Sequence, residues 1–483
     1  MKIHFVTSEA LPFSKTGGLA DVIFGLSSAL CKKEISSIVV SPLYSDIDFS
    51  SFEKVCSLPI TMNWRQLVAD IYRTNINGVD YFFIGNDYYF KREKIYGYDD
   101  EIERFAFFNL SYIEMIKRLN IRPDIVSVHD WETAMIPLLL KHNNLNFKTI
   151  LTIHNPAFQG SSHSGALYDY FNLPYEYFEN GTCRFHDYFS CLKTGIVTCD
   201  VLTTVSKTHA KELLNDLVSF NGLGHIIKLR KKNFVGITNG LDYEEFNPAS
   251  DEYIEYPYDL TTVFPEKQMN QDFLLDSIRF KKDGAVFGII SRLTEQKGLD
   301  ILPLVIDKII KENAKLIVLG SGQPQYERII EGLSKKYPKN IFYYCGYSNS
   351  FAHKIYASCD FLLMPSRYEP CGLSQLVAKR YGTIPIVSNV GGLVDTVVPY
   401  RKEKAINKAD GIVFDISKEE EFVKAIDLAF IVYNDKSTLK KLIKNAMNYK
   451  SSWNDTVVSY ITLYKKIYFA FTWWRRYLRR PFN

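Results

Sequence analysis

Residues 1–26 read MKIHFVTSEALPFSKTGGLADVIFGL, and this stretch decides the fold. A short apolar run, KIHFVTS, leads through a polar turn into a segment that can form a helix after two adjacent glycines. Gly17 and Gly18 would let backbone N–H groups at a helix start approach an anion, and Lys15 would add a positive charge. An ordinary strand-to-helix turn is the alternative interpretation, and this stretch alone does not exclude it.

Similar apolar runs recur along the whole chain, separated by segments of helical length. In the first half they are SSIVVSP, DIVSVHD, KTILTIHN, VLTTVS and FVGITNG, and in the second half AVFGIIS, AKLIVLG, NIFYYCG, DFLLMPS, TIPIVSN and DGIVFD. Continuous runs of Val, Ile and Leu are typical of strands buried on both faces of a parallel sheet. The sequence therefore predicts an α/β protein with two doubly wound domains.

A stretch rich in Pro, Tyr and acidic residues, NGLDYEEFNPASDEYIEYPYDLTTVFPEK, interrupts this pattern. It predicts a connection between two domains. We place the first domain at residues 1–245 and the second at residues 246–455. The last helix signal, SSWNDTVVSYITLYKKIYFAF, follows the second domain and could cover either one.

Composition limits the kinds of partner. Lys and Arg number 58 and Asp and Glu 54, so nothing global favours nucleic acid or a membrane surface. A small molecule or a neutral polymer is the expected partner. The eight cysteines show neither a CxxC pair nor zinc spacing, which indicates reduced thiols and no metal site. No apolar run has the length of a membrane span and no signal peptide precedes the first strand, so we expect a cytoplasmic protein.

Three motifs in the second half follow predicted strands. SRLTEQKGLD places Arg292 and Lys297 on a loop, where they could bind a diphosphate or simply face solvent. SRYEPCGLSQ places Glu369 directly before Pro370 in a turn that contains Gly372, a position that packing explains poorly. SNVGGLVDTV supplies a second pair of glycines, Gly391 and Gly392, at a helix start.

In this order the motifs resemble the family of bacterial glycogen synthases and plant starch synthases. The resemblance runs from Met1 to about Tyr468 and rests on KTGGLADV, VHDWETA, TIHNPAFQG, TNGLD, SRLTEQKGLD, CGY, PSRYEPCGLSQ and GGLVDTV. It implies the GT-B architecture, with two Rossmann-like domains facing a cleft. It also implies a hexosyltransferase that moves glucose, with retention, from ADP-glucose to the non-reducing end of an α-1,4-glucan such as glycogen.

The resemblance implies a set of site residues in the first domain. Lys15 and the Gly17-Gly18 backbone would serve the phosphates and the sugar, Asp21 and Asp130 would lie on the acceptor side, His154 would hold the glucose near its 6-hydroxyl, and Asn239 would be a further sugar ligand. The main-chain carbonyl of His154 would face the anomeric carbon.

A second set is implied in the second domain. Arg292 and Lys297 would clamp the diphosphate, Glu369 with the backbone at Cys371 and Gly372 would hold the glucose 3- and 4-hydroxyls, Tyr347 would stack on adenine, and Gly391 and Gly392 would begin a helix beside the substrate.

No cofactor or metal is expected, because Arg292 and Lys297 would supply the positive charge. Asp46-Ile47-Asp48 is interpreted as a turn and not as a metal site. No carboxylate looks like a nucleophile on the β face of the sugar, so we expect attack on the same face as departure. Many relatives of this architecture carry a ribose-binding Glu eight positions after Glu369, where this chain has Val377. That difference favours glycogen synthases over sucrose or trehalose-phosphate relatives.

Two alternative functions stay open. One is a related retaining transferase that uses UDP-glucose or another acceptor, and the other is a non-catalytic glucan-binding or priming scaffold. Near Gly222 the sequence is looser than in the family, and Glu132 replaces a frequent His. The oligomeric state is not predicted.

The last residues form an aromatic and basic tail, FAFTWWRRYLRRPFN. By analogy with GT-B proteins, the segment 456–483 would begin as a helix that crosses back to the first domain. The aromatic side chains of the tail would then pack on that domain, stack on a glucan, or bind an anionic surface.

Overall fold

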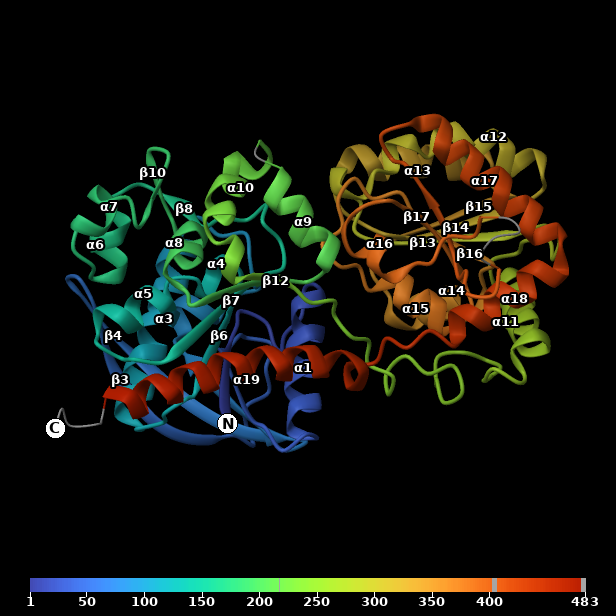
Figure 1. Cartoon of the computed structure of the whole chain (residues 1–483). Helices are drawn as coiled ribbons and strands as arrows, with labels where there is room; N and C mark the ends of the chain where they lie inside the picture. The colour runs from blue at the N-terminus through green and yellow to red at the C-terminus, as the bar shows by residue number, and fades with distance from the viewer. Residues whose placement is uncertain (217, 402–405, 479–483) are drawn as a thin grey trace. The chain divides into compact units, whose positions relative to one another are not determined.

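A computed structural model describes residues 1–216, 218–401 and 406–478, with side chains up to Phe469. The chain forms two compact units (Figure 1). Unit 1 contains residues 1–240 and the segment from Trp453, and unit 2 contains Leu241–Ser452. Both borders precede the positions expected from the sequence, 245 and 455, by a few residues. Leu241 N donates to Ser451 O at 2.7 Å, which ties both ends of unit 2 together at this point.

The main sheet of unit 1 has nine strands in the order β12-β11-β7-β6-β1-β2-β5-β4-β3. Seven strands are parallel: β1 (Lys2–Val6), β2 (Ser36–Pro42), β5 (Val79–Gly85), β6 (Ile125–His129), β7 (Lys148–Ile153), β11 (Val201–Thr204) and β12 (Phe234–Gly236). The strand order reverses between β1 and β6, so the connections that leave these neighbours run in opposite directions.

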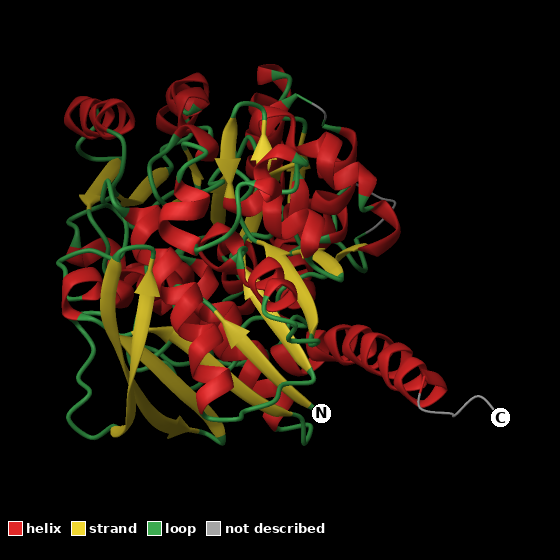
Figure 2. Ribbon diagram, turned by 90° about the vertical axis from the view of Figure 1, so that its left-hand side faces the viewer, coloured by secondary structure: helices red, strands yellow, loops and turns green. Residues whose placement is uncertain are grey.

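One edge of this sheet departs from the expected parallel pattern. The long strands β3 (Glu53–Met62) and β4 (Arg65–Ile76) form an antiparallel hairpin that adds to β5 (Figures 1 and 2). Buried and exposed residues alternate along the end of β3, as is usual for a strand with one solvated face. A search for continuous apolar runs misses such strands for this reason.

The helices of unit 1 are α1 (Gly18–Cys31), α2 (Asp87–Phe90), α3 (Glu101–Arg118), α4 (Asp130–Thr133), α5 (Ile136–His142), α6 (Ala166–Phe171), α7 (Glu176–Glu179), α8 (Cys191–Thr198), α9 (Lys207–Asn215), α10 (Ser219–Leu229) and α19 (Trp453–Leu478). A small sheet joins β8 (Ser161–Ser162), β10 (Tyr188–Ser190) and β9 (Arg184–Phe185).

Helix α10 is kinked near Gly222, where the sequence is looser than in the family. Phe220, Asn221 and Gly222 all have positive φ angles. Gln159 Nε2 donates to Phe220 O at 2.7 Å, and His186 Nε2 lies 2.7 Å from Asn221 O. These two side chains hydrogen-bond the backbone carbonyl groups that have no helical partner at the kink.

Helix α19 belongs to unit 1 and packs against α1 (Figure 1). Trp453, Val457, Tyr460, Tyr464 and Ile467 are buried in the hydrophobic core of this unit. A Cβ placed on Gly25 of α1 would lie only 1.9 Å from Trp453 Nε1, so the indole occupies the space that glycine leaves open. The side chains of the tail proposed to pack, stack or bind, from Trp473 onward, lie outside the described residues.

Unit 2 contains a fully parallel sheet in the order β15-β14-β13-β16-β17-β18. Its strands are β13 (Val286–Ile290), β14 (Lys315–Gly320), β15 (Ile341–Cys345), β16 (Phe361–Met364), β17 (Ile384–Ser388) and β18 (Ile412–Phe414). Its helices are α11 (Val263–Ser277), α12 (Pro303–Lys311), α13 (Pro324–Lys336), α14 (Asn349–Ser358), α15 (Ser374–Arg380), α16 (Gly391–Thr396), α17 (Glu419–Asn434) and α18 (Lys436–Met447). The strand order reverses between β13 and β16.

Replacing Gly25 with Ala tests the packing of α19. In an exposed helix this change stabilises by about 1 kcal/mol, but here overpacking against Trp453 should cost ~1–3 kcal/mol and lower the melting temperature. Gly332→Ala in α13 is the matched control, because nothing lies within 4 Å of its Cβ position. Thermal unfolding should show opposite signs for the two variants. Equal stabilisation by both would mean that Trp453 does not pack on α1.

Candidate active site

Many of the predicted site residues lie where strand order reverses within each unit, whereas His154, Asn239, Tyr347, Gly391 and Gly392 follow other strands. In unit 1, the loop after β1 carries SEALPFSKTGG and the short helix α4 directly after β6 consists of DWET. In unit 2, the segments after β13 and β16 carry SRLTEQKG and PSRYEPCG. At such a point the two connections diverge, and the carboxyl ends of the neighbouring strands are left accessible to ligands.

A buried carboxylate, Glu9, holds the loop between β1 and α1. Its side chain belongs to a residue only 3% exposed. Its Oε2 accepts from Thr16 N at 2.6 Å and Gly17 N at 3.2 Å, and its Oε1 accepts from Thr16 Oγ1 at 2.6 Å and Tyr96 OH at 2.9 Å. Glu9 was not among the residues predicted from the sequence, where its one signal is its place three residues after the end of β1.

This geometry corrects the expected role of one glycine. The N–H of Gly17 already donates to Glu9, and its backbone is extended, with φ of −149°. A Cβ at Gly17 would meet nothing within 4 Å, so neither strain nor crowding within the chain requires glycine here. A glycine at this position keeps open the space in front of the α1 amino terminus, which begins at Gly18.

Lys15 and Asp21 form an ion pair across the start of α1. Lys15 Nζ lies 2.7 Å from Asp21 Oδ1, and their side chains are 34% and 19% exposed. An ion pair with this much solvent access adds little to stability. Both groups therefore stay accessible to a ligand at the amino end of α1.

The ends of the neighbouring strands β6 and β7 bring Asp130 and His154 together. Asp130 has a φ of 53°, and its Oδ1 accepts from His154 N at 2.7 Å and Asn155 N at 3.2 Å. The Asp130 carboxylate thus fixes the backbone at His154.

The ring of His154 also has a partner that the sequence analysis did not identify. His129 Nδ1 lies 2.9 Å from His154 Nε2. Burial lowers the pKa of His154 to about 3. Burial also lowers the pKa of His129, and repulsion from His154 in its protonated form lowers it further. Both imidazoles are therefore neutral near pH 7. The sequence signal was the position of His129, one residue before Asp130.

Two acids beside these histidines titrate far from their ordinary range. Burial raises the pKa of Asp130 to about 7, although the N–H groups of His154 and Asn155 work against this rise. Burial and the neighbouring Asp130 raise the pKa of Glu132 as well. Glu132 Oε2 is buried without a hydrogen-bond partner among the described residues. This cluster therefore keeps protons at a pH where ordinary carboxyl groups have lost them.

Asn239 lies at the end of unit 1 with a buried, unpaired amide oxygen. The residue is 5% exposed, and its Oδ1 has no hydrogen-bond partner in the part of the chain that the structure describes. The next residue, Gly240, is fixed because Trp453 fills the space beside it. Asn239 Oδ1 is thus a fixed acceptor to which a ligand hydroxyl could donate a hydrogen bond.

In unit 2, Lys297 and Glu369 form the central pair. Lys297 Nζ lies 2.6 Å from Glu369 Oε2, which also accepts from Ser366 Oγ at 3.0 Å. The two side chains are 18% and 8% exposed. Gly298 permits this approach, because its φ is 62° and a Cβ there would lie 2.0 Å from Pro365 O. The pair combines a cation and a carboxylate from neighbouring strand ends.

Glycines shape the turn that follows Glu369. Gly372 and Gly391 have φ angles of 73° and 45°. Gly392 N donates to Glu369 O at 3.0 Å, and a Cβ at Gly392 would lie 2.2 Å from Cys371 O. The start of α16 therefore packs directly on the backbone at Cys371, as only glycine allows.

Arg292 and Tyr347 are placed less centrally. Arg292 is exposed on the loop after β13, and its charge opposes the rise that burial and Glu369 cause in the pKa of Tyr368. Tyr347 follows the edge strand β15, is 72% exposed, and donates to Asn349 Oδ1 at 3.1 Å. Arg292 thus lies in the electrostatic surroundings of the turn that carries Glu369, whereas Tyr347 is an exposed residue at the edge of the sheet.

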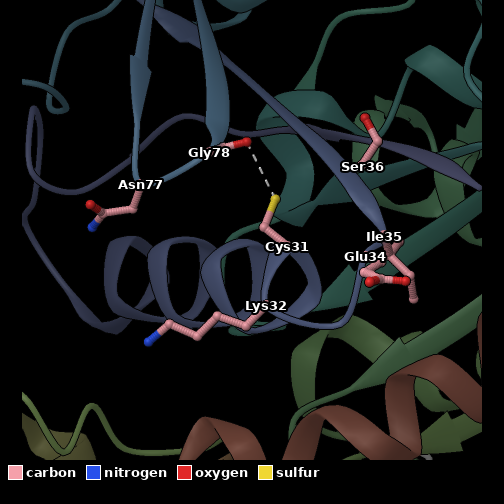
Figure 3. A pocket seen from close by; sticks show the side chains of 7 residues that line it. All are labelled: Cys31, Lys32, Glu34, Ile35, Ser36, Asn77 and Gly78. Atoms are coloured by element: carbon pink, nitrogen blue, oxygen red, sulfur yellow. Dashed lines mark hydrogen bonds between the residues drawn. The ribbon is translucent and has the colours of Figure 1, made fainter.

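Other features of the described residues lie away from this chemistry. A surface hollow of about 450 Å³ is lined by Cys31, Lys32, Ile35, Asn77 and their neighbours (Figure 3), at the carboxyl end of α1.

No group of three or more His, Cys, Asp or Glu side chains among the described residues could hold a metal ion. Asp48 Oδ1 accepts from Ser50 N at 3.0 Å, which makes Asp46–Asp48 part of a turn. None of the described helices is long and apolar enough to cross a membrane.

Comparisons with known proteins agree with this arrangement. Residues 2–229 match the family model of the starch synthase catalytic domain, and residues 270–449 match that of glycosyl transferases group 1. Glycogen synthase of Caldicellulosiruptor bescii is 38% identical over 97% of this chain and 99% of its own. Glycogen synthase of Clostridium beijerinckii is 37% identical over 97% of this chain and 99% of its own.

The chain belongs to the glycogen synthase family. Among solved structures, the catalytic domain of starch synthase IV from Arabidopsis thaliana, bound to ADP and acarbose, is similar with a TM-score of 0.89 and 26% identity. The alignment covers 96% of this chain and 99% of that one. Sucrose-phosphate synthase from Thermosynechococcus elongatus, with a TM-score of 0.60 and 16% identity over 97% and 99% of the chains, shares the fold alone. The fold is the GT-B architecture expected from the sequence.

In this member of the glycogen synthase family, Val377 stands eight positions after Glu369, where a ribose-binding Glu would be expected in sucrose or trehalose-phosphate relatives. It lies in α15, is 3% exposed, and packs in the core of unit 2. A carboxylate at this site would be buried among apolar side chains, which is costly.

The raised pKa of Asp130 gives unit 1 a specific pH dependence. Between about pH 4 and pH 7 the folded state holds a proton that the unfolded state has released, so stability falls as pH rises through this window. Asp130→Asn keeps the acceptor Oδ1 but removes the charge. Its melting temperature should therefore exceed that of the wild type more at pH 8 than at pH 5.

Asp46→Asn, on an exposed loop, serves as the control and should show no such difference. A gain from Asp130→Asn that is equal at both pH values would contradict a raised pKa at Asp130.

Proposed function

We propose that this chain is a glycogen synthase that transfers glucose, with retention, from ADP-glucose to the non-reducing end of an α-1,4-glucan. The observation that carries the proposal is the Lys297–Glu369 pair at the strand-order reversal of unit 2. It places a cation suited to a leaving diphosphate beside a carboxylate suited to sugar hydroxyls. Full-length similarity to glycogen synthases, and to a starch synthase solved with ADP and acarbose, supports this choice of substrates.

The charges match the bond that breaks. When the bond between glucose C1 and the phosphate oxygen breaks, positive charge develops on the sugar and negative charge on the departing ADP. Arg292 and Lys297 would stabilise the diphosphate, and two unit charges 4 Å apart interact by about 4 kcal/mol at an effective dielectric constant of about 20. We propose that these side chains supply the stabilisation without a bound metal or other cofactor.

Glu369 would exchange partners when substrate binds. In the structure its carboxylate is paired with Lys297 and accepts a hydrogen bond from Ser366. Hydroxyls 3 and 4 of the glucose would take up its acceptor positions, with the backbone at Cys371 and Gly372 beside them, while Lys297 turns toward phosphate. Gly391 and Gly392, packed on this turn, would keep it rigid.

The groups of unit 1 would act on the sugar and the acceptor. Lys15, at the open amino end of α1, would add charge near the phosphates, and Asp21 would release it to face the acceptor side. His154 would hold the 6-hydroxyl. Asp130 would act mainly through the backbone, because its Oδ1 binds the N–H groups of residues 154 and 155 and so aims the His154 carbonyl.

Two further assignments complete the proposal. Asn239 would donate or accept a hydrogen bond with the sugar, which would satisfy its buried Oδ1, and Tyr347 would stack on adenine with its exposed ring. The acceptor hydroxyl would attack on the face from which ADP departs and would pass its proton to the departing phosphate. We propose that the protein acts in the cytoplasm.

Lys297→Ala should lower kcat roughly 100- to 1000-fold, because the leaving diphosphate loses a cation in the transition state. Initial rates with ADP-glucose and glycogen measure the effect, and circular dichroism checks the fold. Lys335→Ala removes an exposed ion pair with Glu331 in α13 and should leave the rate unchanged. Near-normal turnover in folded Lys297→Ala would remove this lysine from the mechanism.

A donor panel tests the function itself. The purified chain is incubated with glycogen and ADP-, UDP- or GDP-glucose, and proton NMR of the product reports the configuration of the new linkage. We expect transfer from ADP-glucose with an α-1,4 linkage. Transfer from UDP-glucose alone would reassign the donor. Glycogen binding without transfer from any of the three donors would make the chain a scaffold and overturn the proposal.

A further inference from the structure

A line of hydrogen bonds runs from the interior of unit 1 to the ring of His154. Ser127 Oγ lies 3.2 Å from His129 Nε2, and His129 Nδ1 lies 2.9 Å from His154 Nε2. Ser127 and His129 are two positions apart on β6, so their side chains face the same side of the sheet. At the inner end, Tyr464 on α19 lies beside Ser127: burial raises the pKa of its phenol, and the Ser127 hydroxyl opposes that rise.

Two neutral imidazoles that share a hydrogen bond constrain each other. Each neutral ring carries one N–H and one acceptor nitrogen. If His129 donates from Nδ1, His154 must accept at Nε2 and carry its proton on Nδ1. If His129 accepts at Nδ1, His154 donates from Nε2 and its Nδ1 becomes an acceptor. Either way, the tautomer of His129 determines which function His154 Nδ1 offers.

The backbone of His154 is fixed independently. Asp130 Oδ1 accepts from His154 N at 2.7 Å, so the main chain and the ring are held at two separate points. Of the two ring nitrogens, Nε2 is occupied by His129, which leaves Nδ1 to meet a ligand.

We propose that His129 is a positioning residue that holds His154 in one ring orientation and one neutral tautomer, so that His154 Nδ1 presents a single, fixed hydrogen-bonding function to the transferred glucose. The identity of that sugar rests on the proposed function, whereas the constraint on the ring does not. A fixed donor or acceptor needs no reorganisation when the 6-hydroxyl arrives, and this is what makes preorganised groups effective in catalysis.

A purely structural role for His129 is the competing interpretation, and the chain contains a matched example. His4, on the neighbouring strand β1, is also buried, and burial lowers its pKa to about 3. Its Nδ1 lies 3.0 Å from Tyr112 OH, but its Nε2 has no partner among the described residues. His4 therefore fills the core without continuing a line of bonds to a candidate site residue.

The first experiment reads the tautomer directly in the substrate-free protein. Two-bond ¹⁵N–¹H correlation spectra of histidine-labelled protein distinguish the two neutral tautomers, and loss of signals in His154→Gln assigns that ring. We expect one tautomer of His154 in the wild type and in His4→Phe, and a mixture in His129→Phe. His129→Asn, whose amide lies near the former Nδ1, should restore one tautomer at least in part.

The second experiment compares ADP-glucose with its 6-deoxy analogue. In the wild type, loss of the hydroxyl should lower kcat/KM about tenfold or more. In His129→Phe, the ratio between the two donors should fall toward one, whereas His4→Phe should keep the wild-type ratio. Ser127→Ala, a small change, should shift both readouts in the same direction as His129→Phe, and it replaces that variant if the larger change prevents folding.

An unchanged single tautomer of His154 in folded His129→Phe, or in Ser127→Ala if only that variant folds, would overturn the proposal. So would a wild-type donor ratio in such a variant that still transfers glucose. A wild-type chain without transferase activity would instead refute the proposed function, and the nitrogen spectra would still decide the role of His129.

Discussion

Reversal of strand order in a parallel sheet is the constraint on which the rest of this structure depends. Between β1 and β6, and again between β13 and β16, neighbouring strands send their connections in opposite directions, so the helical layer cannot close over their carboxyl ends. Polar loops can stand at these ends without being covered. The residues assigned to phosphate and sugar come mostly from those loops.

Loops at such a position need support from groups outside the sheet, and buried carboxylates provide much of it. Glu9 accepts four hydrogen bonds and fixes the turn before α1, and Asp130 binds two successive backbone N–H groups after β7. Burying a carboxyl group is costly unless it is hydrogen-bonded or protonated. Glu9 meets the first condition, and the raised pKa of Asp130 shows that it lies near the second.

In unit 2, an ion pair and several glycines support the loops at the strand ends. Lys297 and Glu369 neutralise each other at the strand ends, while Gly298, Gly372 and Gly392 let backbone segments approach more closely than a side chain would permit. Helix α19 contributes to unit 1 in a comparable way, because Trp453 fills the space left at Gly25 and Gly240. Its Tyr464 lies at the inner end of the bonds that lead to His154.

The sequence by itself determined the α/β class, the family and the strand ends that carry the site, because buried parallel strands and glycine-rich turns leave patterns that are local in the chain. It also named Asp130, His154, Lys297 and Glu369 as candidate site residues, and the structure shows which of them lie together: Asp130 with His154, and Lys297 with Glu369. The tertiary structure alone decided the antiparallel hairpin β3–β4, the anchoring role of Glu9, and the partnership of His129 with His154. Each of these features depends on which strands become neighbours and on which side chains lose contact with water. The spacing of residues along one segment encodes neither the strand neighbours nor the burial of particular side chains.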